Sequence, residues 1–469
     1  MTVPDPLALA HERPELSAFQ PFWKRQTIAL ALLLLAFSLL AAVHPLLAGR
    51  LFFSLATFFY LLISSYKMFL LYRSVRSDAE LRFGRSELAA LREDDLPLYS
   101  ILIPLYREAE SLPHLVASLQ RLDYPADKLD IQLLLEEDDR ETREAAARLA
   151  LPPSFRLTLI PPSLPRTKPK ACNIGLAHAR GEFLVIYDAE DQPEPDQLKK
   201  AVLGFRRSAP RVLCLQSKLN FYNPRQNWLT RFFTAEYSSW FDLSLPGLSS
   251  LRTVMPLGGT SNHFRTEPLR TLLGWDAYNV AEDCDLGVRL CRAGWKTRML
   301  DTTTWEEACS DLGFWIRQRT RWYKGYMQTF LVHTRQPIRL LRELGWRNAF
   351  HFAMIVGGML ITLLLNPLFW TLTALWFIRR FSALDPFFPP LVFLMGATCL
   401  FVGNFAFMYA GALGCYRRRC YDLVKYALLM PPYWLLMSIA AWRALVQLVV
   451  NPFHWEKTRH GLTTTPRAP

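Results

Sequence analysis

The chain has 469 residues, of which 51% are hydrophobic, a mean hydropathy of +0.08 and a formal net charge of +13. This composition is too apolar for an ordinary soluble domain and too polar for membrane helices alone, so it indicates a protein with both parts. The basic residues form no stripe interleaved with aromatic residues, which argues against a nucleic-acid partner.

The N-terminal part predicts a membrane hairpin. Residues 1–26 would form a cytoplasmic segment, and 27–73 contain two apolar runs that are each long enough to cross a bilayer. A secretory signal peptide would have a shorter apolar core and a small-residue cleavage site, so two transmembrane helices are the better interpretation.

The C-terminal part, 349–450, predicts three further apolar runs, followed by a tail at 451–469. Three crossings would place this tail on the side of the membrane opposite the middle of the chain. Two prolines, Pro431 and Pro432, offer the alternative that the last run is interfacial or re-entrant. Alternatively, the first of the three runs forms more than one element.

Basic residues gather beside the apolar runs, at Arg73, Arg76, Arg339, Arg347 and in the stretch 417–419. By the positive-inside rule this pattern places the middle of the chain and the N-terminus in the cytoplasm. The eight cysteines include no C-x-x-C pair, which argues against a zinc site or a disulfide framework and fits reduced thiols.

The middle of the chain, 97–335, alternates short apolar runs with helical patterns, which predicts an α/β domain with a largely parallel sheet. Ligands of such sheets bind beyond the carboxyl ends of the strands. Two acidic clusters, Glu136–Asp139 and Asp188–Asp191, follow what we expect to be neighbouring strands. A solvated turn explains one such cluster, but two would repel each other unless something positive lies between them, which is either a phosphate-bound cation or a substrate with hydrogen-bond donors. Hard cations such as Mg²⁺ or Mn²⁺ take oxygen ligands of this kind.

Two further stretches carry candidate chemistry. Glu282 and Asp283 open a predicted helix, where an acid can serve simply as a partner of the helix dipole. Gln318, Arg321 and Trp322 share one helical face. An Arg beside a Trp can be a structural cation–π pair, but Arg also suits a phosphate and Trp a sugar ring. The aromatic, amphipathic stretch at about 227–245 predicts an interfacial helix rather than core.

The ordered set "EEDD", "KACN", "DAED", "AED" and "QRTRW" resembles the membrane-embedded family 2 glycosyltransferases, which include cellulose, chitin and hyaluronan synthases. The resemblance implies an α/β GT-A (Rossmann-like) catalytic domain inserted between α-helical transmembrane segments. It also implies a multi-pass protein of the bacterial inner membrane with Mg²⁺ or Mn²⁺ as cofactor. The activity implied is inverting transfer of a hexose from a nucleotide sugar, with UDP-glucose preferred, to a growing β-linked polysaccharide that is exported. Partner subunits in the envelope would be consistent with it.

The resemblance also implies roles for individual residues. Asp283, preceded by Glu282, would be the general base, and Asp188 with Glu190 or Asp191 would hold the metal. Gln318, Arg321 and Trp322 would hold the diphosphate and the acceptor end. The nucleotide sugar would contact the acids of the first cluster, two lysines and the first acid of the second cluster: Glu136, Glu137, Asp138, Asp139, Lys168, Lys170 and Asp188.

Two alternatives differ in class. Transfer of one sugar to a lipid acceptor uses the same domain, although "QRTRW" and the number of C-terminal apolar runs favour polymer synthesis. A membrane transporter or receptor without enzymatic activity would not need acids at three positions together with "QRTRW". The tail resembles the family's gating loop through Trp455, Thr458 and His460.

Overall fold

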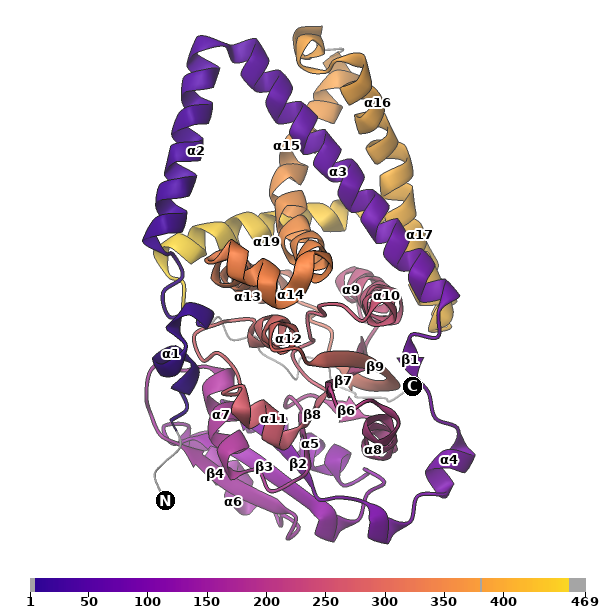
Figure 1. Ribbon diagram of the computed structural model, residues 1–469. Coiled ribbons are helices and arrows are strands. Elements are labelled where there is room, and N and C mark those ends of the chain that lie inside the picture. Colours follow the sequence, from indigo (N-terminus) through magenta and orange to yellow (C-terminus); the bar gives the residue numbers. More distant parts are fainter. Residues whose placement is uncertain (1–4, 380–381, 455–469) are drawn as a thin grey trace.

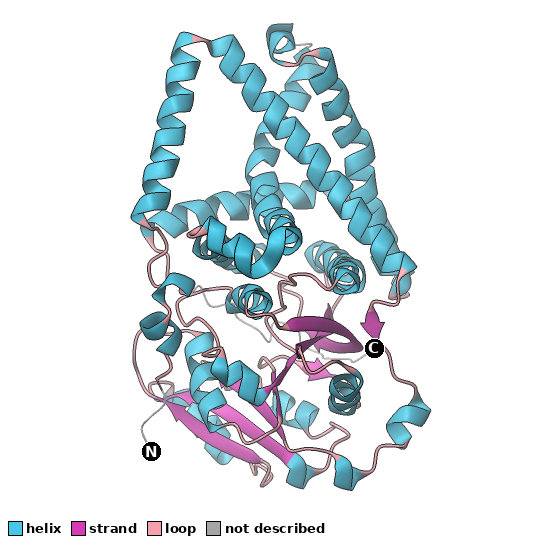
Figure 2. Ribbon diagram, viewed as in Figure 1, coloured by secondary structure: helices cyan, strands magenta, loops and turns pink. Residues whose placement is uncertain are grey.

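The computed structural model describes residues 5–379 and 382–454. A lower α/β domain and an upper group of long helices are separated by a layer of helices that lie across the molecule (Figures 1 and 2). The chain enters the upper group through α2 and α3, builds the α/β domain, and returns to the upper helices from α14 onward.

The α/β domain is built on a sheet that has nine strands in the described part of the chain. Their order is β1-β9-β7-β8-β5-β2-β3-β4, and β6 pairs with β9. Most pairs are parallel, but β8 runs antiparallel to both of its neighbours and β6 antiparallel to β9. The strands are β1 Glu80–Leu81, β2 Tyr99–Leu105, β3 Leu129–Glu136, β4 Phe155–Ile160, β5 Phe183–Ile186, β6 Gln192–Pro193, β7 Val212–Phe221, β8 Asn262–Arg265 and β9 Lys296–Glu306.

The central strands are continuous apolar runs because helices cover both faces of the sheet. Successive side chains of β2 point to opposite faces, so Ile101 and Ile103 join one buried cluster and Leu102 the other. The first cluster includes residues of α5 (Leu112–Leu119), α6 (Arg140–Arg148) and α8 (Gln197–Arg207). The second includes residues of α7 (Lys168–His178), α11 (Thr266–Thr271) and α12 (Glu282–Arg292). The expected α/β fold with a largely parallel sheet is confirmed.

The expectation that the two acidic clusters follow neighbouring strands is wrong. Strands β3 and β5, which precede the clusters, both pair with β2 and lie on opposite sides of it. The chain places β3 on one side of β2 and then crosses over to add β5 on the other. A crevice opens beyond the carboxyl ends of the strands at such a reversal, so both clusters still lie at its edge.

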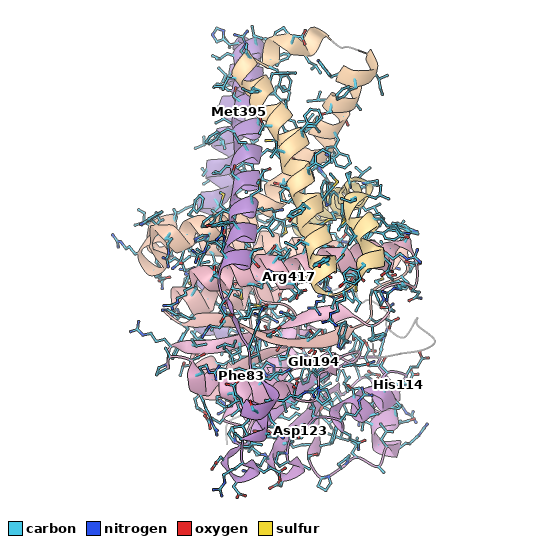
Figure 3. The ribbon with its side chains drawn as sticks, turned by 90° about the vertical axis from the view of Figure 1, so that its right-hand side faces the viewer. Phe83, His114, Asp123, Glu194, Met395 and Arg417 are labelled. Atoms are coloured by element: carbon cyan, nitrogen blue, oxygen red, sulfur yellow. The ribbon has the colours of Figure 1, made fainter. Side chains whose placement is uncertain are left out.

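Four helical segments of the upper group stand roughly upright in the described chain: α2 (Lys24–Val43), α3 (Pro45–Arg76), α15 (Gly358–Arg379), and α16 (Pro390–Thr398) continued by α17 (Asn404–Arg417). Their apolar side chains face outward along much of their length, most of all on α2, which has no buried residue. Water does not tolerate an apolar surface of this extent, whereas lipid does. Met395 lies near the far end of these helices and Arg417 at their base, beside the α/β domain (Figure 3).

The last helix, α19 (Pro431–Val450), is one of five in the described chain that are long and apolar enough to cross a membrane. It nevertheless lies across the base of the upright helices (Figure 1) and packs against α13 (Leu312–Thr334) and α15. The residues after it return to the α/β domain, where Lys324 Nζ donates a 2.7 Å hydrogen bond to the carbonyl of His454. We therefore keep the interfacial alternative for the last apolar run as our prediction.

The same layer contains α14 (Pro337–Phe352) and the aromatic stretch expected to be interfacial, which forms α9 (Trp228–Ser239), a π-helical turn (Trp240–Ser244) and α10 (Leu245–Leu251). Asn227 caps α9 by accepting a 3.0 Å hydrogen bond from the backbone N–H of Thr230. The shorter helices are α1 (Ala8–Glu12), α4 (Arg85–Ala89) and α18 (Val424–Leu428).

The segment before α2 is fastened to the loop that leads into α12. Asp276 in this loop is fully buried and accepts hydrogen bonds from Ser17 Oγ at 2.8 Å and from the backbone N–H of Ala18 at 2.6 Å. Tyr278 of the same loop packs edge-on against Phe19 and also against Phe453, which follows α19. The segment that precedes α2 in the sequence and the segment that follows α19 therefore both contact this loop.

Candidate active site

A cavity of about 640 Å³ extends from the carboxyl ends of the strands to the space between the upper helices. The helices α3, α9, α12, α13, α15, α17 and α19 contribute to its walls. Nine of the residues singled out from the sequence line it: Glu136, Lys168, Asp188, Glu190, Glu282, Asp283, Gln318, Arg321 and Trp322. The remaining five, Glu137, Asp138, Asp139, Lys170 and Asp191, lie outside this lining.

Asp188 follows β5 and forms an ion pair with Lys168 at the start of α7. Lys168 Nζ also donates a 2.7 Å hydrogen bond to the carbonyl of Gly259. Burial lowers the pKa of Lys168, but the charges of Asp188 and Glu282 outweigh it, and the net effect raises the pKa above its ordinary value. A permanent positive charge therefore sits between two acids of the cavity.

Glu190 and Asp191 occupy different environments although they are adjacent in sequence. Glu190 lines the cavity. Asp191 is buried beneath it, where its Oδ2 accepts hydrogen bonds from Thr260 and from the backbone N–H of Asp188, the latter at 2.8 Å. Burial and the charges of Asp188 and Glu190 raise the pKa of Asp191 well above its ordinary value. Asp191 thus shapes the turn that presents Asp188.

Asp283 lies in the first turn of α12, and its carboxylate lies beside Gly259 in the lining of the cavity. A Cβ atom added at Gly259 would lie 3.6 Å from Asp283 Oδ2, so the glycine leaves room beside this carboxylate. Burial raises the pKa values of both Asp283 and Glu282, and the proximity of the two carboxylates adds to the effect at Glu282. A raised pKa suits a carboxylate that has to take a proton near neutral pH.

The helix α13 carries the "QRTRW" residues into the cavity. Gln318 is 8% exposed, and its Oε1 has no hydrogen-bond partner within the described chain. A buried amide oxygen of this kind favours a ligand or water at the same place. Burial lowers the pKa of Arg321, and the negative charges of Glu282, Asp188 and Asp283 partly offset this effect. The carboxylates and this guanidinium therefore share one site.

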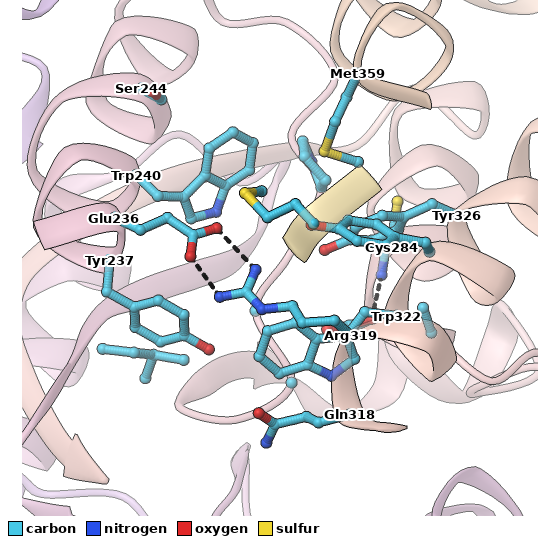
Figure 4. Close-up of a pocket in the computed structure, with 18 of the residues that line it drawn as sticks. Glu236, Tyr237, Trp240, Ser244, Cys284, Gln318, Arg319, Trp322, Tyr326 and Met359 are labelled. Carbon is cyan, nitrogen blue, oxygen red and sulfur yellow. Dashed lines mark hydrogen bonds and ion pairs between the residues drawn. The ribbon is translucent and has the colours of Figure 1, made fainter. Parts of the chain in front are cut away.

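Trp322 presents its ring beside an ion pair that connects three helices. Arg319 of α13 donates to both carboxylate oxygens of Glu236 on α9, at 2.7 and 2.5 Å (Figure 4). Tyr433 of α19 donates a 2.6 Å hydrogen bond to the same carboxylate. The Arg319 guanidinium also lies 4.7 Å from the Trp322 ring centroid. This contact fixes the indole, which offers a flat wall to the cavity.

The first acidic cluster contributes mainly to local structure. Asp139 caps α6 by accepting a 3.3 Å hydrogen bond from the backbone N–H of Thr142, and Asp138 pairs with Arg166 at 2.5 Å. The side chain of Glu137 is exposed, which leaves Glu136 as the one member of the cluster that lines the cavity.

Of the two candidate lysines, likewise only one faces the cavity. Lys170 is fully buried, donates to the carbonyls of Pro161 and Ser163 at 3.3 and 3.0 Å, and lies 3.6 Å from Glu136. It supports the loop before α7, whereas Lys168 faces the cavity.

Several residues of the site escaped the sequence analysis. Glu306 and Glu307, at and after the end of β9, also line the cavity. Burial and the charges of Asp191, Glu190 and Asp188 raise the pKa of Glu306 well above its ordinary value, which places it beside the second acidic cluster. The signal was a third acidic strand end in "TTTWEEAC", of the same kind as the two that were recognised.

No group of three or more His, Cys, Asp or Glu side chains that could hold a metal ion occurs in residues 5–379 and 382–454. A protein that binds Mg²⁺ or Mn²⁺ together with a diphosphate needs only one or two carboxylates, because phosphate oxygens and water complete the coordination. Asp188 and Glu190 fit that pattern. The residues of the expected gating loop, Trp455, Thr458 and His460, lie outside the described residues.

Comparison with known proteins shows which proteins the chain is similar to. The sequence profile described as glycosyl transferase family group 2 matches residues 183–408. The mannosyltransferase PcManGT from Pyrobaculum calidifontis, solved with GDP-Man and Mn²⁺, superimposes with a TM-score of 0.51 at 19% identity over 86% of this chain and 99% of that chain. The chain therefore resembles the family 2 glycosyltransferases over residues 183–408 and has the GT-A fold of that solved structure.

Two curated relatives are similar to part of this chain. Probable glycosyltransferase YdaM of Bacillus subtilis is 28% identical over 261 residues, which are 55% of this chain and 62% of that protein. Probable glucomannan 4-beta-mannosyltransferase 10 of Arabidopsis thaliana is 25% identical over 277 residues, 55% of this chain and 48% of that protein. The matches thus span about half to three-fifths of the length of these relatives.

Proposed function

We propose that the protein is a membrane-embedded, inverting hexosyltransferase that moves a hexose from a nucleotide sugar to a hydroxyl of a growing β-linked glycan. One observation carries this proposal: the cavity that contains Asp188, Asp283 and Arg321 continues upward between the long apolar helices. A donor would bind at the strand ends, and an acceptor would reach Asp283 from the helical side.

The chemistry follows from the positions of the side chains. Asp283 takes the proton of the acceptor hydroxyl, because its carboxylate faces open space beside Gly259 and its pKa is raised. Arg321 and Lys168 offset the negative charge that develops on the departing nucleoside diphosphate. Attack from the side opposite the leaving group inverts the anomeric centre, so an α-linked donor gives a β-linked product.

Asp188 and Glu190 are the residues that would hold a divalent cation. Their carboxylate oxygens are the ligands that Mg²⁺ and Mn²⁺ prefer. When bound, the cation supplies charge neutralisation at the diphosphate of the donor. Burial raises the pKa values of Glu306 and Asp191, whose carboxyl groups lie close enough to these acids that neighbouring charges raise the values further, and a bound cation would relieve this crowding of carboxyl groups.

Two nucleotide sugars are candidates for the donor, UDP-glucose and GDP-mannose. The motifs favour UDP-glucose, whereas the names of the Arabidopsis relative and of the Pyrobaculum structure specify mannosyl transfer. Release of nucleotide from UDP-glucose and from GDP-mannose, followed by linkage analysis of the product, decides between them.

The membrane arrangement is part of the proposal. The four upright helical segments would cross a bacterial inner membrane, with the α/β domain in the cytoplasm. The arginines near the bases of α3 and α17, Arg73, Arg76 and Arg417, lie on the side of the α/β domain, as the positive-inside rule requires.

Substitution of Asp283 by Asn tests the proposed function. It should lower turnover at least about 100-fold, because the acceptor hydroxyl loses its base. Donor affinity should stay within about 2-fold, since Asp283 is assigned to the acceptor. Asp422→Asn is the matched control, because Asp422 is half-exposed and pairs with Arg225 away from the cavity. Loss of donor binding in Asp283→Asn, or unchanged turnover, would overturn the assignment.

A further inference from the structure

Lys67 is a cation at an unusual depth in the group of upper helices. It lies on α3, six residues before Arg73 and nine before Arg76. A rise of 1.5 Å per residue puts it about 9 and 14 Å above these arginines along the helix. A lysine within an apolar segment is costly and usually has a functional partner.

The side chain of Lys67 stays at that depth. Its Nζ lies 4.3 Å from the centroid of the Phe407 ring on α17, and the residue lines the cavity. Phe407 precedes Arg417 by ten residues, which corresponds to about 15 Å along α17. A lysine that extended its amine toward water would instead point to the level of Arg417.

No carboxylate forms an ion pair with Lys67 in residues 5–379 and 382–454. Glu236 is the acid whose charge acts on it. That carboxylate is already held by two hydrogen bonds from Arg319 and one from Tyr433. Within the described part of the chain, the charge of Lys67 therefore has no carboxylate of its own.

The upper helices contribute aliphatic and sulfur-containing side chains to the cavity that Lys67 lines, beside aromatic and polar ones. The aliphatic and sulfur-containing side chains include Ile63, Met68, Met354, Met359, Leu363 and Met437. Such side chains suit a hydrocarbon chain, whereas the hydroxyl groups of a bare glycan would lose hydrogen bonds to water against them. An anionic group joined to an apolar chain matches Lys67 together with these apolar side chains of the cavity.

We propose that Lys67 binds the phosphate of a lipid to which the acceptor glycan is attached, and that the apolar part of the cavity holds the chain of this lipid. The proposal rests on the proposed function and names the chemical class of the acceptor. The phosphate of a lipid-linked sugar would lie near Lys67, while the sugar extends past Trp322 toward Asp283. The enzyme would then select lipid-linked over free glycans.

Binding of farnesyl phosphate, with farnesol as its uncharged counterpart, tests the site. The full chain is placed in nanodiscs of phosphatidylcholine, and binding is measured by native mass spectrometry. Lys67→Met should weaken farnesyl phosphate binding at least about 10-fold and leave farnesol unchanged, while Lys67→Arg should retain most of the affinity. Lys425→Met is the control, because Lys425 is exposed, stacks on Tyr426 and lies outside the cavity lining.

Equal binding of farnesyl phosphate by the original protein and Lys67→Met would overturn the proposal, as would equal affinities for farnesyl phosphate and farnesol. Preference for short-chain phosphatidic acid over farnesyl phosphate would support the phosphate site and assign its source to a glycerophospholipid. Binding of UDP-glucose and of GDP-mannose without lipid is measured in parallel. Donor binding should persist in Lys67→Met, whereas absence of donor binding from the original protein would reject the proposed function and leave the lipid-binding result independent.

Discussion

The separation of Glu190 and Asp191 shows how burial assigns different tasks to adjacent carboxylates. Asp191 Oδ2 holds the backbone of Asp188 and the hydroxyl of Thr260, while Oδ1 is buried with no hydrogen-bond partner in the described chain. Since burial and neighbouring charges raise the pKa of Asp191, the neutral form is favoured. An amide has the shape and hydrogen-bonding capacity of that form.

We therefore expect Asp191→Asn to fold normally and to retain Mn²⁺-dependent nucleotide binding. Glu190→Gln should instead weaken that binding at least about 10-fold, because a carboxylate ligand is lost. Calorimetric titration of nucleotide with and without Mn²⁺ checks both variants, and Asp191→Ala serves as a comparison that should lose about 1–3 kcal/mol of stability. The opposite order of effects would make Asp191 the second ligand.

For individual residues, the sequence predicts that several acids follow a strand, but it does not predict which of these acids faces a ligand. Three acids within four residues give the same pattern whichever one is buried. The sequence likewise could not indicate which of Lys168 and Lys170 faces a ligand. The two are only two positions apart on α7, yet the side chain of Lys168 faces the cavity and that of Lys170 is buried in the protein. Their roles depend on tertiary contacts with Gly259 and with the loop around Pro161, which no local pattern reveals.

At the level of elements, the Arg319–Glu236 pair joins α13, α9 and α19 directly beside Trp322. Breaking it with Glu236→Gln or Arg319→Met should lower stability by about 3–5 kcal/mol, because one buried charge loses its partner. The double variant should recover most of this loss. Unfolding in detergent measures the coupling, and the exposed Arg225–Asp422 pair provides a control that should contribute less than about 1 kcal/mol. Additive losses would show that the two residues act separately.

The elements themselves were largely predictable. A strand that is buried on both faces, such as β2, is a continuous apolar run. A helix that is buried on one face, such as α8, has an amphipathic pattern, and both patterns can be recognised in the sequence. The order of strands was not predictable in the same way. The placement of β2 between β3 and β5, and the reversed direction of β8, result from crossovers that depend on the whole sheet. Glu306 and Glu307, at and after the end of β9, were not predicted as site residues, because β9 is distant in sequence from β3 and β5, which precede the two acidic clusters.

For the whole molecule, the position of α19 sets the expected membrane topology. Four crossings return the chain to its starting side, so the C-terminus should lie with the α/β domain in the cytoplasm. Alkaline phosphatase fused after residue 469 should be inactive and a fluorescent protein at the same place should fluoresce. Phosphatase fused after residue 385, between α15 and α16, should be active. Active phosphatase at residue 469 would show that α19 crosses the membrane.

The contacts of Lys324 impose an order on assembly. Lys324 is fully buried in α13, and its Nζ donates to Gln447 Oε1 and to the carbonyls of Asn451 and His454, at 3.2, 3.4 and 2.7 Å. These acceptors are synthesised more than a hundred residues after α13, once every upright helix has been made. Asp276 likewise depends on Ser17 and Ala18 from before the first helix. A fragment restricted to 97–335 would lack all of these partners, so we expect the α/β domain to reach this packing only together with the segments before α2 and after α19.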